Sequence, residues 1–294
     1  MLRKLVLPVL PAVAAIAVVI AVVAFWGMRL PADGTVAPVE WLSATALFVA
    51  VGAFFCEYID STLGMGYGTT LTPVLLLLGF DVMDVVPAVL FSELFTGIVA
   101  GISHHQVGNV SLRPGHKDFR VSMVLALCSI VGTLVAVFVA VSLPGFYLNL
   151  YIGLLVLAMG ALILASRNRM RAFSWGRIVG LGMVASFNKG MSGGGYGPVV
   201  TSGQILSGVE GKSAVGITSF AEGLTCAVGV TTYIILQDGT LLWRLAGPLA
   251  VGALLSVPLS AWSVKRISTK GLTLAIGLLT TALGLLTLYR VLLG

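Results

Sequence analysis

The chain contains a duplicated segment, which strongly limits the folds it can adopt. Residues 64–99 align without a gap with residues 193–228, 129 positions later, and twelve of the 36 aligned positions are identical. The first-copy members of the identical pairs are Gly64, Gly66, Tyr67, Gly68, Thr72, Leu77, Gly79, Val86, Phe91, Glu93, Thr96 and Val99. Each copy thus carries a glycine cluster and a carboxylate. Duplicated membrane segments that are broken by glycines are typical of secondary transporters.

The composition indicates a membrane protein. Hydrophobic residues make up 58% of the chain and charged residues 10%, whereas about a quarter of the residues in soluble domains are charged. The net charge of +6 resides mainly in short connections between apolar runs, where basic residues set membrane topology, so nucleic-acid binding is excluded as a function. Cys56, Cys128 and Cys226 lie within apolar segments without paired spacing, which favours small core residues over disulfides or metal ligands.

The apolar runs predict an all-α, polytopic membrane protein. Residues 5–27 form an apolar run of 23 residues after Arg3 and Lys4, longer than the core of a signal peptide, which is about 7–15 residues, so we expect a retained first span. Further spans are expected over residues 41–59, 85–102, 121–143, 146–165, 178–187, 213–236, 245–264 and 272–293.

Two further apolar pieces, residues 69–79 and 198–207, are too short to cross a bilayer. They contain 11 and 10 residues and would extend roughly 15–17 Å as helices. The hydrocarbon core is about 30 Å thick. We therefore expect two half-helices or re-entrant elements, each entered through a glycine-rich break.

The basic residues predict the orientation of the spans. Three connections rich in Lys and Arg, within residues 113–120, 167–177 and 265–270, should face the cytoplasm, and residues 144–145 and 237–243, which have none, should face outside. The N-terminus is then cytoplasmic and the C-terminus external.

With this orientation the chain divides into three parts. Residues 1–40 form an N-terminal span with an external loop, and residues 41–165 and 166–294 form two halves that run in opposite directions. Such inverted-topology repeats allow one scaffold to alternate between two access states.

The glycine breaks, near residues 61–70 and 192–197, interrupt apolar spans. Irregular backbone survives at membrane depth only where protein buries it or a wet cavity solvates it. Its free N–H groups, followed by a half-helix N-terminus, present partial positive charge and favour an anionic substrate. The alternative is that the glycines only allow close helix packing. Their equivalent placement in both copies favours the binding-site interpretation.

Charged residues within the spans are the next signal, because each is costly in a bilayer unless it is paired or hydrated. Glu93 and Glu222 occupy equivalent positions. They carry protons along the translocation path, or they cap N–H groups of the breaks. Lys189 lies just before the second break and has Asp60 as its counterpart. It supplies a countercharge for the anion, or it pairs with Asp60 or Glu57.

The candidate site follows from these features. Glu93 and Glu222 are the candidates for proton coupling. Candidates for substrate binding are the break residues and their polar neighbours: Ser61, Thr62, Gly64, Gly66, Tyr67, Gly68, Thr69, Asn188, Lys189, Ser192, Gly193, Gly194, Gly195, Tyr196 and Gly197.

No cofactor or metal is expected. His104, His105 and His116 have no Cys or acidic cluster at ligand spacing beside them. His104, at a predicted cytoplasmic helix end, is expected to be interfacial.

Several of these motifs resemble the TauE/SafE sulfite exporter family. They are the first break with Pro73 after it, the segment His104-x-x-x-Gly108-Asn109-Val110, the second break Gly-Gly-Gly-Tyr-Gly-Pro, and residues 211–216. The resemblance covers residues 41–294 and implies movement of sulfite, sulfonates such as sulfoacetate, and related organosulfur anions across the bacterial inner membrane. The chain departs from the family pattern in two ways. Its first break has fewer glycines, and Glu57 and Asp60 precede that break, which disfavours an anion unless they are neutralised.

The predicted function is secondary transport of a small oxyanion by alternating access, with proton coupling as an option, and not enzymatic catalysis. An anion channel that uses the same half-helix site is the alternative. The expected partners are a small anionic substrate and the lipid bilayer, with a homodimer left open.

Overall fold

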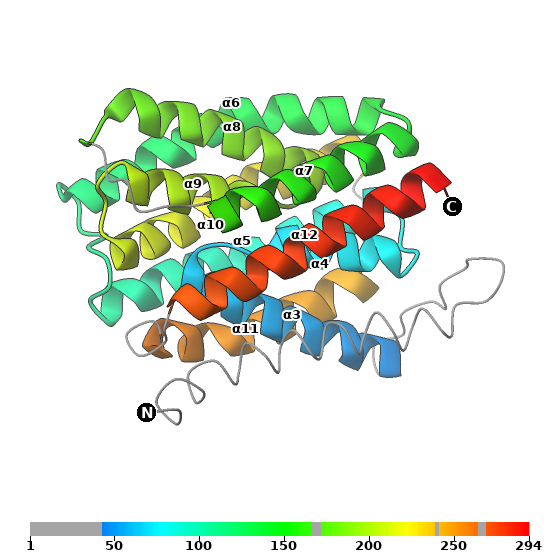
Figure 1. Ribbon diagram of the computed structural model, residues 1–294, viewed down its shortest axis with the longest axis horizontal. Helices are drawn as coiled ribbons and strands as arrows, with labels where there is room; N and C mark the ends of the chain where they lie inside the picture. The colour runs from blue at the N-terminus through cyan, green and yellow to red at the C-terminus, as the bar shows by residue number, and fades with distance from the viewer. Residues whose placement is uncertain (1–42, 166–171, 239–240, 264–268, 294) are drawn as a thin grey trace.

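The computed structural model describes residues 43–165, 172–238, 241–263 and 269–293 (Figure 1). These residues form ten helices and contain no strand, which confirms the all-α prediction. Seven of the helices are long and apolar enough to cross a membrane. The expected N-terminal span and its loop, residues 1–40, lie outside the described residues.

The helices fall into two sets of five, and we keep the labels of Figure 1 for them. The first set is α3 (Ala44–Leu63), α4 (Tyr67–Leu77), α5 (Val82–Gln106), α6 (Lys117–Ser142) and α7 (Gly145–Ala165). The second set is α8 (Trp175–Ser192), α9 (Tyr196–Leu206), α10 (Gly211–Leu236), α11 (Trp243–Ser263) and α12 (Thr269–Leu293).

Most predicted spans differ from these helices only at their ends, but one was too short. The span expected over residues 178–187 is part of α8, which has 18 residues and ends directly at the second glycine break. The half-helices α4 and α9 contain 11 residues each and begin at the equivalent Tyr67 and Tyr196. Each reaches about 16 Å at ~1.5 Å per residue, which agrees with the predicted half-length elements.

The helices run roughly along one common direction, with α5 and α10 in contact near the middle of the bundle (Figure 1). Small residues allow these two helices to approach closely. A Cβ atom added to Gly97 of α5 would lie 2.7 Å from the backbone nitrogen of Gly223 in α10. Because Glu93 and Glu222 lie within one turn of these glycines, the close crossing brings the two glutamates into the same region.

The remaining contacts follow a regular scheme. Helix α3 packs against α11 and α8 packs against α6, while α11 also contacts α5 and α6 also contacts α10. Likewise α4 contacts α12, and α9 contacts α7. In this scheme α3 corresponds to α8, α4 to α9, α5 to α10, α6 to α11 and α7 to α12. If each helix is replaced by its corresponding helix, every contact in the scheme becomes another contact in the scheme.

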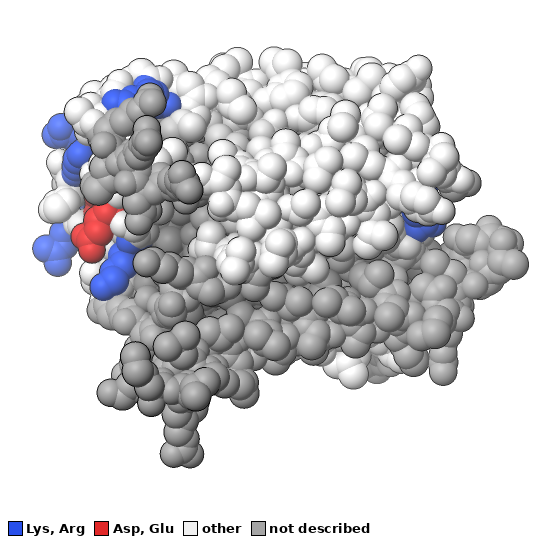
Figure 2. All heavy atoms as spheres, in the orientation of Figure 1, with Lys and Arg blue, Asp and Glu red and all other residues white. Residues whose placement is uncertain are grey.

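Where Figure 2 shows described residues, the middle of the surface is uncharged, and most of the Lys and Arg lie at the left end, with a further basic patch at the right end. Large apolar side chains such as Leu127, Leu154 and Leu255 are more than half exposed. In a bilayer this band would face lipid, which is as apolar as leucine. The polar residues are concentrated instead inside the bundle, at the helix breaks.

Candidate functional site

Both glycine breaks begin in the same way, with a helix that ends at a glycine in the left-handed conformation. Helix α3 ends at Gly64 and α8 ends at Gly193, each in the left-handed region at φ 69°. The N–H of Gly64 donates to the carbonyl of Asp60 at 2.5 Å, and that of Gly193 donates to the carbonyl of Lys189 at 2.8 Å. The half-helices then begin after Gly66 and Gly195, whose φ values are 134° and 77°. Side chains other than glycine are strained in this region, which explains the glycine pattern.

The two breaks cross each other backbone to backbone. A Cβ atom on Gly68 would lie 1.8 Å from the carbonyl oxygen of Gly193, and one on Gly197 would lie 2.5 Å from that of Gly64. These two contacts are equivalent under the offset of 129 residues. The crossing therefore brings the two halves of the chain into direct contact, and no side chain would fit between them.

A buried charge cluster lies close to this crossing. The ammonium of Lys189 in α8 donates to a carboxylate oxygen of Glu222 in α10 at 2.7 Å, and it also forms an ion pair with Glu93 in α5. Lys189 has an exposed fraction of 0%, and those of Glu93 and Glu222 are 2% and 4%. One ammonium is thus held by two carboxylates from equivalent positions of the two copies.

This pairing corrects two expectations. Lys189 is paired, as one alternative had it, but with Glu93 and Glu222 and not with Asp60 or Glu57. Among the described residues, neither glutamate accepts a hydrogen bond from an N–H group of a break. The carboxylate that does so is Asp60, which accepts from the N–H of Tyr67 at 3.3 Å. The capping alternative for the glutamates is therefore wrong.

Asp60 adds a third carboxylate to the cluster. One carboxylate oxygen each of Asp60, Glu93 and Glu222 lies within 4.8 Å of the others. Sequence spacing gave no sign of this trio, because its members come from three helices. A trio of this spacing could hold a metal ion, but the Lys189 ammonium already supplies a positive charge to two of the three. We assign no metal to it.

Glu57, one turn before Asp60, is also buried. Its carboxylate accepts hydrogen bonds from Ser61 at 2.5 Å and from Thr96 at 3.1 Å. Two neutral donors, and no cation among the described residues, therefore face this acid.

His104 is not interfacial, contrary to expectation. Its side chain is fully buried, and Nε2 lies 2.8 Å from the backbone carbonyl of Ser61. Because a carbonyl only accepts, Nε2 must carry the proton, and Nδ1 then accepts from Asn109 at 2.9 Å. The histidine is held as a neutral tautomer that satisfies one of the free carbonyls at the end of α3.

The second copy has an equivalent hydrogen bond to a backbone carbonyl, but a different side chain forms it. The hydroxyl of Tyr233 donates to the carbonyl of Gly190 at 2.9 Å. Tyr233 is the counterpart of His104, and Gly190 is the counterpart of Ser61, at the same offset of 129 residues. A signal for the burial of His104 was thus present in the sequence, in the tyrosine that replaces it in the other copy.

The other predicted polar residues lie at the breaks but use most of their donors locally. Thr62 and Ser192 donate to carbonyls one turn earlier, at 2.6 and 2.8 Å. The side-chain oxygen of Asn188 accepts from Tyr151 at 2.8 Å. Thr69 is buried, and no described residue forms a hydrogen bond with its hydroxyl. Tyr67 and Tyr196 are fully buried, and the Tyr67 hydroxyl bonds to Ser92 at 2.8 Å.

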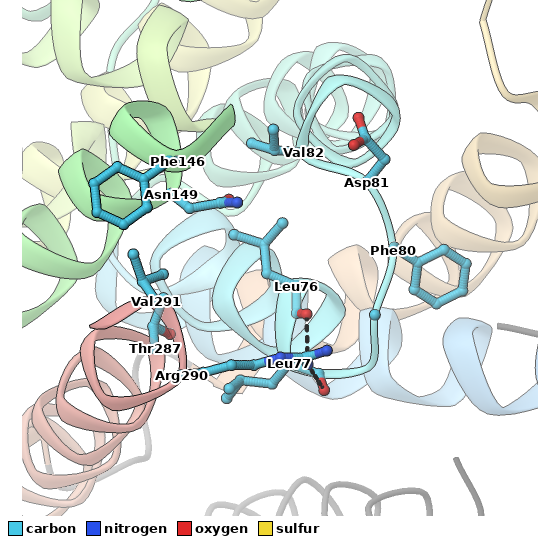
Figure 3. Close-up of a pocket in the computed structure, with 11 residues that line it drawn as sticks. Leu76, Leu77, Phe80, Asp81, Val82, Phe146, Asn149, Thr287, Arg290 and Val291 are labelled. Atoms are coloured by element: carbon cyan, nitrogen blue, oxygen red, sulfur yellow. Dashed lines mark hydrogen bonds between the residues drawn. The ribbon is translucent and has the colours of Figure 1, made fainter. Parts of the chain in front are cut away.

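A pocket of about 380 Å³ lies away from the charge cluster, beyond the C-terminal end of α4 (Figure 3). Arg290 of α12 donates to the carbonyl of Leu76 at 3.0 Å and also to that of Leu77, as the dashed lines in Figure 3 show. Asn149 points into the pocket from α7. The lining residues are Leu76, Leu77, Gly79, Phe80, Asp81, Val82, Phe146, Asn149, Thr287, Arg290 and Val291.

A polytopic helical bundle with two broken helices and a buried charge cluster where they cross is the architecture of a membrane transporter. The chain belongs to the sulfite exporter TauE/SafE family, whose model matches residues 48–287. A relative in Bacillus subtilis (strain 168), the probable membrane transporter protein YtnM, is 26% identical over 244 residues, which cover 79% of this chain and 78% of the relative. No solved structure matches the chain.

Proposed function

We propose that the protein is a secondary transporter that moves a small oxyanion, such as sulfite, a sulfonate like sulfoacetate or a related organosulfur anion, by alternating access. The observation that carries the proposal is the Lys189 ammonium, buried beside the crossing of two helix breaks and held by Glu93 and Glu222. A buried charge within a membrane bundle marks a substrate or ion path by default. We infer transport without chemical conversion, because the matching family and the Bacillus subtilis relative are described as transporters.

The two halves act as inverted repeats in this proposal. Support comes from the helix contacts, which map onto one another when the two sets of five are exchanged, and from the equivalent crossings of Gly68 with Gly193 and of Gly197 with Gly64. The gathering of Lys and Arg at one end of the bundle supports a cytoplasmic face there (Figure 2). We place the protein in the inner membrane with the N-terminus cytoplasmic and the C-terminus external. A homodimer is compatible with this arrangement.

We place the anion at the second break, on the residues 188–197. The N-terminus of α4 already has a carboxylate, because Asp60 accepts from Tyr67. Helix α9 begins after Gly195, which makes no side-chain cap, and among the described residues no carboxylate takes the place that Asp60 holds at α4, so we expect its N-terminus and dipole to favour a bound anion. Glu93 and Glu222, which hold Lys189, are the groups that we expect to carry the coupling proton.

A binding screen tests the substrate class. Purified protein would be titrated with sulfite, sulfate, thiosulfate, sulfoacetate, taurine and simple carboxylates, and we expect the sulfur oxyanions to bind. Lys189→Met should abolish binding, whereas Lys212→Met, which changes a lysine exposed at the start of α10, should retain it. Equal affinity in the two variants would remove Lys189 from the site.

Counterflow distinguishes a transporter from a channel with the same site. Liposomes loaded with unlabelled substrate should accumulate labelled substrate transiently, because an alternating-access carrier exchanges one molecule for another. A channel shows no counterflow, and its absence together with electrical conductance would favour the channel alternative.

A further inference from the structure

In this structure the only lysine buried among the described residues is fully engaged. Its ammonium faces Glu93 from α5 and Glu222 from α10, and its exposed fraction is 0%. An anion that approaches the breaks therefore meets an ammonium already neutralised by two carboxylates.

The surroundings add further negative charge. Asp60 lies within 4.8 Å of both glutamates, and Glu57, on the same helix α3, is buried too. With all four acids ionised, the four negative charges outnumber the one positive charge of Lys189. Like charges at this separation repel strongly where little water screens them, so a further anion would be excluded from this state.

The other titratable groups near the cluster do not offset this excess. They are Cys56 from α3, Tyr67 from α4, Tyr196 from α9 and Cys226 from α10, which are neutral when protonated, and His104 from α5, which its hydrogen bonds hold as a neutral tautomer. Helix α11 contributes one charged residue, Arg244, in its first turn.

We propose that protons release Lys189 for the substrate, so that the anion and at least one proton bind together and travel in the same direction. The proton comes from water and bonds to a carboxylate oxygen of Glu93 or Glu222. That carboxyl group then holds the ammonium only weakly, and Lys189, which stays protonated, turns an N–H toward the anion. This inference rests on the proposed function, because it assumes an anionic substrate.

A second observation supports a proton at this place. Oε1 of Glu93 is buried and has no hydrogen-bond partner among the described residues, although the other oxygen of the same carboxylate faces Lys189. An unpartnered buried carboxylate oxygen is costly. A proton on Oε1 would turn it into a donor, and one carboxylate oxygen each of Asp60 and Glu222 lies within 4.8 Å of a carboxylate oxygen of Glu93.

The test measures anion affinity against pH on the full chain in detergent, with methanesulfonate and sulfoacetate as probes, because the sulfonate group stays ionised throughout. We expect the Kd of the parent protein for the anion to fall about tenfold for each unit by which the pH is lowered, for each proton taken up on binding. Calorimetry in two buffers that differ in ionisation enthalpy counts those protons directly and needs no variant.

The variants assign the effect to residues. Glu93→Gln or Glu222→Gln should bind the probe at high pH as tightly as the parent does at low pH, with a shallower dependence on pH. Glu57→Gln is the matched control, since Glu57 is equally buried but faces Ser61 and Thr96, and it should keep the slope of the parent. Melting temperatures would verify that all three variants fold.

The outcomes separate this inference from the proposed function. A probe that binds the parent with one Kd at every pH, without proton uptake, would overturn proton-dependent release and leave anion transport standing. Failure of every tested anion to bind the parent and both glutamine variants at any pH would overturn the proposed function itself.

Discussion

The two breaks share one backbone and differ in the charge that precedes it. Both helices end at a left-handed glycine with φ 69°, and both half-helices start at a tyrosine three residues later. At the equivalent positions before the glycines, however, α3 carries Asp60 and α8 carries Lys189. Asp60 binds the N-terminus of its own half-helix, whereas Lys189 reaches across to Glu93 and Glu222. The backbone of a duplicated element can therefore stay the same while its two copies take different tasks.

The largest effect should follow from placing a side chain in the crossing. Gly68→Ala should prevent folding, because the new Cβ would lie 1.8 Å from a carbonyl oxygen, and Gly197→Ala should do so less completely at 2.5 Å. The yield of monodisperse protein in size-exclusion chromatography measures both. Gly52→Ala in α3 is the control, since among the described residues outside its own stretch of helix no atom lies within 4 Å of its added Cβ. Normal yields for all three variants would contradict the crossing.

Neutralising the two charges should have opposite consequences. Lys189→Met leaves two buried carboxylates without a cation and should destabilise the protein by about 3–5 kcal/mol. Asp60→Asn removes surplus negative charge and keeps an oxygen that can accept from Tyr67, so it should be neutral or stabilising. Thermal unfolding in detergent measures both changes. Adding Glu93→Gln and Glu222→Gln to Lys189→Met should restore part of the loss, and equal destabilisation by Lys189→Met and Asp60→Asn would refute this account of the cluster.

A smaller effect should follow from removing the side-chain hydrogen bonds to the carbonyls in the last turns of α3 and α8. His104→Phe would leave the carbonyl of Ser61 without its His104 partner and remove one of the two hydrogen bonds of the Asn109 amide, at a cost of about 1–3 kcal/mol. Tyr233→Phe removes one hydroxyl from the carbonyl of Gly190 and should cost about 1 kcal/mol. Melting temperatures of the two variants measure the two contributions. A larger decrease for Tyr233→Phe than for His104→Phe would contradict the expected order.

The smallest effect concerns two equivalent threonines. Thr201 donates to the carbonyl of Gly64 at 2.6 Å, whereas the buried hydroxyl of Thr72, its counterpart, has no partner within the described part of the chain. Thr201→Val should cost about 1 kcal/mol, and Thr72→Val should be neutral or slightly stabilising. Each variant is the control for the other in the same melting experiment, and a loss in Thr72→Val as large as in Thr201→Val would indicate a bond that this structure lacks.

Local features of this fold could be predicted from the sequence, and long-range pairing could not. The half-helices could be predicted because apolar pieces of 11 and 10 residues after a glycine cluster cannot cross a bilayer. Glu93 and Glu222 stood out because charge within a span is costly. The ion-pair partners of Lys189 depend on how α8 lies against α5 and α10, and no local sequence pattern predicts this packing. The burial of His104 was missed because a histidine beside basic residues suggests an interface. Its counterpart Tyr233, within an apolar span, was the better guide.

The opposite charges at the two breaks also bear on how such a chain can evolve. In a symmetric dimer of two identical halves, the position held here by Asp60 and Lys189 would carry the same residue twice, giving either two acids or two lysines beside the glutamates. An arrangement with one of each requires two separately encoded copies. A single chain that encodes both copies meets this requirement, and a Lys189→Asp change, which would make the two copies alike at this position, would remove the only buried lysine of the described residues.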